Sequence, residues 1–329
     1  MDPTLFADDL ARKPEVLGRL ADRLVADPDP WHGFATQAPP PHLVLIGMGS
    51  SYFAAAVAAA RLRAAGVDAV AERAGSGLLP RPREGTRVVA VSAGGGSRET
   101  RWAVGRYHGH CPVALLTNTP DSPMAGEVDL VVPMHAETEV GGVACRSYLH
   151  TLVLLLALER GLTRSPVDLV GTLRRSAGAI ADLQDRVGEW WDPVTELIAG
   201  RDGTYVVAPA RRLCSAEQSA LMLREGPRRA AVACETGDWS HVDVYLTKTL
   251  DYRMLLLAGS RWQDELLRWT AERGSTVVAV GADVDGAAYS LRYAGDEDDD
   301  VRLLAETTVA EQVAAGLWAD ATPAPAEPG

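Results

Sequence analysis

The stretch LVLIGMGSSYFAAAVAAARLRAAG, residues 43–66, decides the fold. Its apolar run LVLI ends in glycines, and an alanine-rich segment follows and stops at Gly66. A short, continuous apolar run of this kind is typical of a strand that is buried on both faces, as in parallel sheets covered by helices. The stretch therefore predicts a strand followed directly by a helix, which is one unit of an α/β domain.

The same pattern recurs along the chain. In the first half, further strands are predicted at residues 67–72, 87–92, 112–118 and 129–134, and a buried helix at 151–161. In the second half, strands are predicted at 204–209, 242–246, 253–259 and 276–281, and helices at 214–225 and 261–274. Strands that alternate with helices form parallel sheets. We therefore expect an α/β chain of two doubly wound, flavodoxin-like domains, each with three αβα layers.

The domain boundaries are placed where segments rich in Pro and Gly, or without strands, interrupt this pattern. We expect an N-terminal helical segment at 1–30, a first domain at 31–165, a helical linker at 166–200, a second domain at 201–320 and a disordered tail at 321–329. The acidic run at 295–300 is predicted to be a solvated loop, and residues 302–320 a single terminal helix.

Composition narrows the range of partners. The 329 residues carry a net charge of −12, which argues against a nucleic-acid partner. No run approaches the ~20 apolar residues that span a bilayer. The four cysteines are scattered, without CxxC or a His–Cys cluster, so neither a disulfide nor a metal or other cofactor is expected. Since the N-terminus also lacks a basic and apolar leader, we expect a cytoplasmic protein.

Two loops rich in Gly and Ser follow predicted strands of the first half. They are GMGSSY at 47–52 and SAGGGSRET at 92–100. Glycines let the backbone approach an anion, and the helix that follows offers free N–H groups. The pattern fits a phosphate monoester, although ordinary strand–helix turns have the same composition. Neither loop is a Walker A or GxGxxG motif, so a nucleotide is disfavoured.

These loops resemble the signatures of the sugar isomerase (SIS) family, and the chain resembles its two-domain members. Gly49-Ser-Ser-Tyr52 is similar to the family's G-[TS]-S-Y, Ser92–Thr100 to S-x-S-G-x-[ST]-x-E-T, and Glu139–Arg146 to E-x-G-V-A-S-T-K. The resemblance implies a phosphorylated sugar as ligand. It implies these binding residues: Gly49, Ser50, Ser51, Ser92, Ala93, Gly94, Gly95, Ser97, Thr100, Val143 and Ala144.

The second half resembles the part of the family that carries the proton chemistry. The helix SAEQSALMLRE ends at Glu225, which matches the glutamate that moves a proton between C1 and C2 of the open-chain sugar. His241, sixteen residues later, matches the histidine that helps to open the ring and often comes from the neighbouring subunit. One carboxylate and one further acid/base suffice for ketose–aldose interconversion. The alternative is a surface carboxylate and a loop histidine without a chemical role.

The resemblance implies a phosphosugar isomerase, or an aminosugar-phosphate deaminase, that assembles as a homodimer. Several departures weaken that interpretation, among them His241-Val-Asp243 in place of the family's His-Gly-Pro. The second loop has Ala93-Gly94 where the family has x-Ser, the helix lysines are replaced by Met222 and Arg224, and no lysine follows Lys248 to match the family's terminal one. A non-catalytic sugar-phosphate sensor that regulates a partner therefore remains the alternative.

Overall fold

The computed structural model describes residues 1–34 and 42–322, and the chain forms two compact units. The N-sheet unit comprises Glu15–Thr138 and Ala144–Arg174. The C-sheet unit comprises Met1–Pro14, Glu139–Val143 and Arg175–Gly329. Each unit contains one five-stranded sheet, and each is described by itself below.

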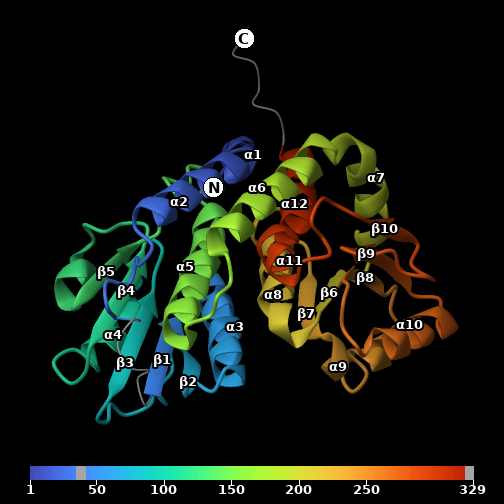
Figure 1. Cartoon of the computed structure of the whole chain (residues 1–329). Coiled ribbons are helices and arrows are strands. Elements are labelled where there is room, and N and C mark those ends of the chain that lie inside the picture. The colour runs from blue at the N-terminus through green and yellow to red at the C-terminus, as the bar shows by residue number, and fades with distance from the viewer. Residues whose placement is uncertain (35–41, 323–329) are drawn as a thin grey trace. The chain divides into compact units, whose positions relative to one another are not determined.

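All strands of the N-sheet unit are parallel, in the order β2-β1-β3-β4-β5. They are β1 (His42–Gly47), β2 (Ala69–Arg73), β3 (Thr86–Val91), β4 (Val113–Thr117) and β5 (Leu130–Pro133). The helical segments are α2 (Lys13–Ala26), α3 (Ser50–Ala64), α4 (Arg98–Gly105), η1 (Pro123–Glu127), α5 (Arg146–Thr163) and the start of α6 (Leu169–Asp185). Helices α3 and α5 pack together on one face and α4 covers the other, which gives three layers (Figure 1).

The C-sheet unit repeats this topology. Its strands are β6 (Thr204–Ala208), β7 (Ala231–Glu235), β8 (Arg253–Leu257), β9 (Thr276–Val280) and β10 (Tyr289–Leu291). Their order, β10-β9-β8-β6-β7, is the order of the first sheet read from the other end, and all are parallel. Both sheets thus have the flavodoxin-like strand order. The predicted fold class is confirmed.

Helices cover the second sheet as well. They are α1 (Pro3–Ala11), α7 (Val187–Ile198), η2 (Ala210–Arg212), α8 (Leu213–Glu225), α9 (Thr236–Trp239), η3 (Asp243–Lys248), α10 (Gln263–Glu272), α11 (Asp299–Ala305) and α12 (Thr307–Ala321). Helices α7 and α8 both pack against α12, and α1 contacts α12 too. Leu266 of α10 packs with Tyr205, Met254 and Val277 in the core of the unit.

The strand predicted at 242–246 is wrong, because this segment forms η3. Asp243, Val244 and Thr247 are its buried residues, a helical spacing rather than an alternating one. Polar groups can turn inward here because Tyr252 donates its hydroxyl hydrogen to the Asp243 carboxylate, and Thr247 donates to the carbonyl of Val244. Two strands, β7 and β10, were not predicted, and both lie at the edges of this sheet. Strand β10 has only three residues, and β7 has a single buried residue, Ala231, so neither gives the continuous buried pattern of a central strand.

The predictions for the C-terminal region also need correction. The acidic run is not simply a solvated loop, since Asp296 is buried and binds Arg292, and Asp298 caps α11 by accepting from the amides of Asp300 and Val301. The single predicted helix is two helices, α11 and α12, that meet at Glu306. Most of the predicted tail, and residues 35–41, lie outside the described residues.

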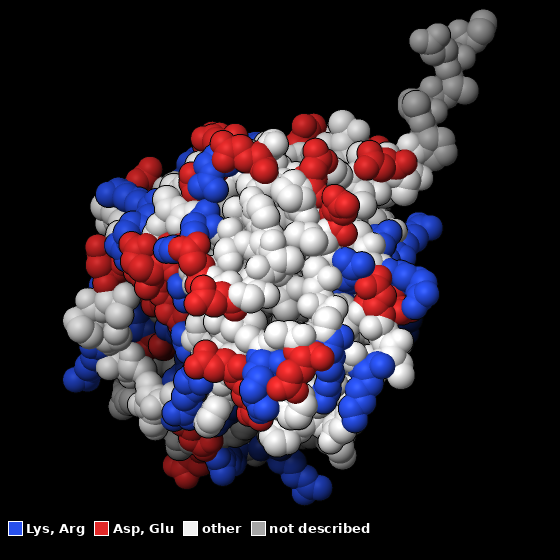
Figure 2. Space-filling view, turned by 90° about the vertical axis from the view of Figure 1, so that its right-hand side faces the viewer, with Lys and Arg blue, Asp and Glu red and all other residues white. Residues whose placement is uncertain are grey.

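The outer surface carries charges of both signs. Figure 2 shows acidic and basic side chains intermingled around an uncharged centre on one face of the molecule. Among the described helices, none is long and apolar enough to cross a membrane.

A fully buried ion pair lies within the C-sheet unit, between Lys13, the first residue of α2, and α12. The Lys13 ammonium bonds to the Glu311 carboxylate, and neither side chain is exposed to solvent. Burial raises the pKa of Glu311, while the Lys13 charge opposes this rise. Removing one partner of a buried pair leaves the other charge without compensation, which is far more costly than losing an exposed pair.

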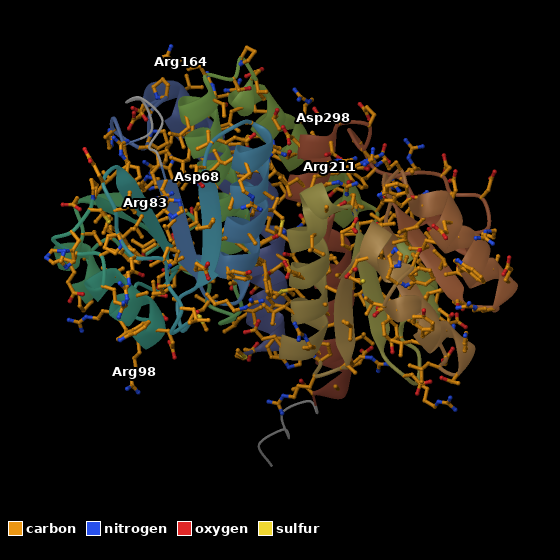
Figure 3. All side chains as sticks on the ribbon, turned by 90° about the horizontal axis from the view of Figure 1, so that it is seen from below. Asp68, Arg83, Arg98, Arg164, Arg211 and Asp298 are labelled. Carbon is orange, nitrogen blue, oxygen red and sulfur yellow. The ribbon has the colours of Figure 1, made fainter. Side chains whose placement is uncertain are left out.

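Replacing Lys13 by Met should therefore lower the free energy of unfolding by about 3–5 kcal/mol near pH 8. The loss should shrink toward pH 5, because a protonated Glu311 tolerates burial without a partner. Urea unfolding at both pH values measures this. The control is Arg83→Met, which breaks the exposed Arg83–Asp68 pair of 2.8 Å (Figure 3) and should cost about 1 kcal/mol at most. Equal losses in the two variants would contradict the prediction.

Candidate functional site

The two Gly/Ser loops lie side by side in the N-sheet unit. One follows β1 and the other follows β3, and these strands pair directly, with Ile46 opposite Ala90. The strand order reverses between them, since β2 lies beyond β1 and β4 beyond β3. Ligands of doubly wound sheets bind outside the carboxyl ends of the strands at such a reversal. The predicted phosphate loops therefore occupy the ligand position of this sheet.

The first loop turns sharply from β1 into α3. A Cβ on Gly47 would lie 2.8 Å from the backbone carbon of Ser51, so only glycine fits there. Gly49 has φ +51° and precedes Ser50, the first residue of α3. Within the described residues the hydroxyls of Ser50 and Ser51 make no hydrogen bond, and both side chains are partly exposed. The loop can thus offer hydroxyls and helix amides to an anion.

In the second loop the serines have different roles. Ser97 caps α4: its hydroxyl accepts from the amide of Thr100 at 3.2 Å and from the Thr100 hydroxyl at 3.1 Å. It also donates to Glu99 at 3.1 Å. Ser92 is 7% exposed, and within the described residues its hydroxyl makes no hydrogen bond. Ser92 is therefore the serine of this loop that is free to meet a ligand.

Gly95 holds the second loop in shape. Its φ is +61°, its amide donates to the carbonyl of Ser92 at 3.0 Å, and a Cβ on it would lie 2.2 Å from the Ser122 hydroxyl oxygen. Ala93, whose carbonyl accepts from the amide of Asn118 at 2.9 Å, is tied to the end of β4. Gly94 is exposed and has open space around it. The loop is thus fixed at Ala93 and Gly95.

Polar residues that sequence reasoning missed shape the segment after β5. Asn118 donates to the carbonyl of Glu137 at 2.6 Å and accepts from the amide of Ala136 at 2.9 Å. His150 donates from Nδ1 to the carbonyl of Met134 at 2.7 Å, and burial lowers its pKa to about 4, so the ring is neutral. The signal for His150 was a polar start of α5, an otherwise apolar helix, whereas no local pattern marked Asn118, which follows β4.

Val143 and Ala144 lie on either side of the division between the two units. The segment that contains Val143 is bound to α1: the amide of Gly141 donates to Asp9 at 2.7 Å, and a Cβ on Gly141 would lie 2.5 Å from Cα of Phe6. Ala144 precedes α5 and is partly exposed. Both residues are among those that the structure describes, and their contact with a ligand stays a prediction.

Glu225 ends α8 in the C-sheet unit. Its side chain is half-buried and, within the described residues, makes no hydrogen bond or ion pair. Burial raises the pKa of this carboxyl. The neighbouring Gly226 packs against Trp318 of α12, where an added Cβ would lie 2.9 Å from the ring. A desolvated carboxyl at a rigid helix end is a suitable general base.

His241 follows α9 and is exposed. Its amide donates to the carbonyl of Asp238 at 2.8 Å. It lines an open pocket of about 450 Å³ together with Trp262 and three carboxylates, those of Glu235, Asp238 and Glu265. Glu225 is not among the residues that line this pocket.

Glu225 and His241 lie at opposite ends of the strands of the second sheet. Helix α8 starts after the carboxyl end of β6 and returns to the amino ends of the strands, where β7 begins. Glu225, the last residue of α8, therefore lies at the amino ends of the strands. Strand β7 then crosses the sheet, and His241 follows its carboxyl end. Five residues of strand span about 17 Å. Within one chain, these two residues therefore cannot both contact the reacting carbons of one sugar.

Among the described residues, no three His, Cys, Asp or Glu side chains gather in a way that could hold a metal ion.

Comparison with known sequences identifies the first domain. Residues 38–159 match the SIS domain family. Glutamine–fructose-6-phosphate aminotransferase (isomerizing) from Zymomonas mobilis is 30% identical over 126 residues, which are 37% of this chain and 21% of that protein. The match thus spans about a fifth of the length of this curated relative.

Solved structures share the fold over nearly the whole chain. The C-terminal domain of glucosamine-fructose-6-phosphate aminotransferase from Francisella tularensis superposes with a TM-score of 0.81 at 16% identity, covering 96% of this chain and 95% of that one. Tagatose-6-phosphate ketose/aldose isomerase from Escherichia coli gives 0.79 at 16% identity, covering 98% and 95%. Both domains of the chain therefore have counterparts in these proteins.

The conformation of Gly95 yields a test of the second loop. Replacing Gly95 by Ala should lower the free energy of unfolding by about 1–3 kcal/mol, because the new Cβ meets Ser122 and the left-handed backbone is strained. Gly94→Ala is the matched control and should change it by about 0.5 kcal/mol at most. Ser122→Gly should recover part of the loss in the Gly95→Ala protein. Urea unfolding measures all four proteins, and similar stabilities for the two alanine variants would refute this account of the loop.

Proposed function

Because residues 38–159 form a SIS domain and the chain has the double-SIS fold, we propose that it is an enzyme acting on a hexose or aminohexose 6-phosphate. The reaction is an aldose–ketose isomerisation, or the deamination of an aminosugar phosphate, through an enediol or enolamine. The proposal places the protein in the cytoplasm and requires no cofactor. The observation that carries it is Glu225, a half-buried carboxyl whose pKa is raised by burial.

The phosphate is held by the loops after β1 and β3. The hydroxyls of Ser50, Ser51 and Ser92, which are free within the described residues, donate to its oxygens, and the amides at the start of α3 add to them. Ser97 contributes by capping α4, which keeps the amides of that helix start in place. The phosphate so held anchors the open-chain sugar, whose C1 and C2 are the carbons that react.

Glu225 takes the proton from one of C1 and C2 and returns it to the other. A single carboxylate can serve both carbons because they are adjacent, and a raised pKa brings its proton affinity closer to what proton transfer at neutral pH needs. His241 acts earlier, on the ring oxygen, where an imidazole can both give and take a proton. Since the two residues lie at opposite ends of the strands of one sheet, His241 comes from a second copy of the chain, and the working unit is a homodimer.

The experiment that tests the chemistry is solvent deuterium exchange. In deuterium oxide, the wild-type protein should incorporate deuterium at C1 or C2 of at least one hexose or hexosamine 6-phosphate, as read by NMR. Glu225→Gln keeps the shape but removes the base, so exchange should fall by about 10²–10⁴-fold while sugar-phosphate affinity by calorimetry changes little.

Glu196→Gln is the matched control, because Glu196 is an exposed glutamate of α7 in the same unit. It should exchange deuterium at the wild-type rate. A wild-type protein that binds a sugar phosphate tightly but exchanges no deuterium with any member of the panel would refute the enzyme. The sensor would then be the function, and Glu225 and His241 would have no chemical role.

Mixing two inactive variants tests the shared site. Glu225→Gln and His241→Asn should each be inactive alone, whereas a refolded equal mixture should recover about a quarter of wild-type activity. Half of its dimers would be mixed, and each mixed dimer would hold one intact site of two. A mixture as inactive as its components, with mixed dimers demonstrated by mass spectrometry, would show that the two residues serve the same site from one chain.

A further inference from the structure

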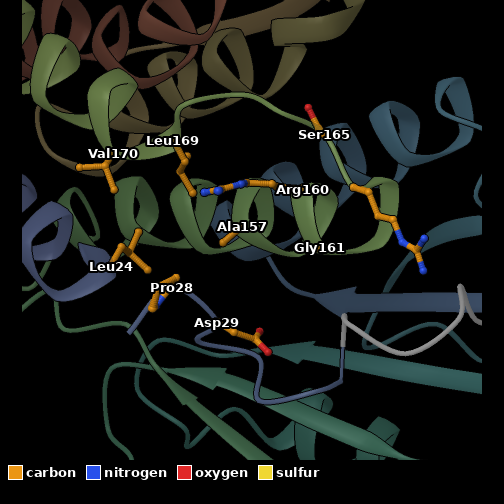
Figure 4. Close-up of a pocket in the computed structure, with 10 residues that line it drawn as sticks. Leu24, Pro28, Asp29, Ala157, Arg160, Gly161, Ser165, Leu169 and Val170 are labelled. Carbon is orange, nitrogen blue, oxygen red and sulfur yellow. The ribbon is translucent and has the colours of Figure 1, made fainter. Parts of the chain in front are cut away.

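A hollow of about 280 Å³ lies at the carboxyl-terminal end of α5 in the N-sheet unit (Figure 4). Three segments wall it: the end of α2 with the turn that follows, the last turn of α5 with the residues after it, and the start of α6. Leu24 and Leu169 give it an apolar side, and both are largely buried. The proposed sugar chemistry does not use this hollow.

The hollow is remote from the sugar-phosphate loops. Helix α5 begins beside the carboxyl ends of the strands, where His150 bonds to the carbonyl of Met134 just after β5. It then runs for 18 residues, about 27 Å, before it reaches the hollow. In Figure 3, Arg164 at the hollow and Arg98, next to the second loop, project from opposite ends of this unit.

Two arginines at the hollow have no counter-charge. Within the described residues, Arg160 and Arg164 make no hydrogen bond or ion pair through their side chains. Their nearest acidic neighbour in sequence, Glu159, already pairs with Arg61 at 2.7 Å. In Figure 4 the Arg160 side chain lies along the hollow toward Leu169. Unpaired guanidiniums are notable in a chain with 44 acidic and 32 basic residues.

The start of α6 adds further donors on the same side. This helix is 17 residues long, and Val170 of its first turn lines the hollow. Asp168 accepts from the amides of Gly171, at 2.9 Å, and Thr172, at 3.0 Å, and the amide of Leu169 donates to the carbonyl of Val167. Within the described residues, the amide of Val170 is therefore the first-turn amide that has no acceptor. Ser165 brings a hydroxyl. The carboxylate on the opposite wall, Asp29, is held by its own turn, since it accepts from the amides of Trp31 and Gly33.

We propose that this hollow is a second binding site, for a small molecule that carries a phosphate or carboxylate group and a compact apolar part. The guanidiniums of Arg160 and Arg164 bind the oxyanion in charge-assisted hydrogen bonds, and the start of α6 and Ser165 complete its coordination. The apolar part lies against Leu24 and Leu169. The volume suits a ligand of about the size of a substituted benzene ring.

Phenyl phosphate and benzoate serve as probes, because each joins one of the two oxyanions to a compact apolar ring. Calorimetry is done in a Ser92→Ala background, which weakens the sugar-phosphate loops. The double change Arg160→Gln, Arg164→Gln should weaken binding of the preferred probe by about tenfold or more. The control, Arg81→Gln, removes an exposed arginine outside the hollow and should leave the affinity unchanged.

A second measurement places the probe on the protein. Phenylglyoxal modifies exposed arginines, and peptide mass spectrometry reports each position. The preferred probe should slow modification of Arg160 and Arg164 several-fold, but not that of Arg81. Equal affinity in the parent and the double variant, or protection that sodium chloride reproduces at the same ionic strength, would overturn the site. These readouts do not involve Glu225, so they stand or fall independently of the proposed enzyme activity.

Discussion

A parallel strand that leads straight into a helix must turn within a few residues, and this constraint determines the rest of the molecule. After β1 the turn is so tight that Gly47 has no room for a Cβ, and Gly49 takes a left-handed backbone. The same turn exposes the first amides of α3 and the hydroxyls of Ser50 and Ser51 at the edge of the sheet. The tight turn that connects the strand to its helix therefore also forms an anion site. The same glycines and serines serve both the turn and the site.

The C-sheet unit has the same strand order but fills the corresponding position with its own side chains. Arg212 follows β6, is fully buried, and pairs with Asp299 and Glu306 while donating to the carbonyl of Ala258 after β8. Gly259, with φ +117°, passes so close that a Cβ would lie 2.6 Å from a guanidinium nitrogen of Arg302. A site closed by buried ion pairs leaves little room for a ligand. In the proposed function this unit instead supplies Glu225 and His241, which lie at opposite ends of the strands of its sheet.

Most of the fold could be predicted from the sequence, because continuous apolar runs that end in glycine mark buried parallel strands. The prediction failed where polar residues are buried and apolar ones exposed. The η3 segment looked like a strand because Asp243 stands between Val242 and Val244, but Asp243 is buried and Val242 is exposed. In the candidate site, Gly49 and Ser92 could be found from local pattern. Asn118 and His150 could not, since their role depends on carbonyls of a segment that only the folded chain brings to them. The different roles of Ser92 and Ser97 likewise needed the geometry of the cap.

Glu225 shows what the proposed chemistry costs the fold. Burial disfavours the ionised carboxyl and raises its pKa, and within the described residues Glu225 makes no ion pair that would compensate this effect. Because the folded-state pKa lies above the unfolded one, the neutral carboxyl favours folding at low pH, and this contribution is lost as the pH rises through the folded-state pKa. A glutamine would avoid the penalty with the same shape. A carboxylate kept at a helix end against this loss of stability is what a general base requires, since a fully solvated glutamate would be too weak a base near neutral pH.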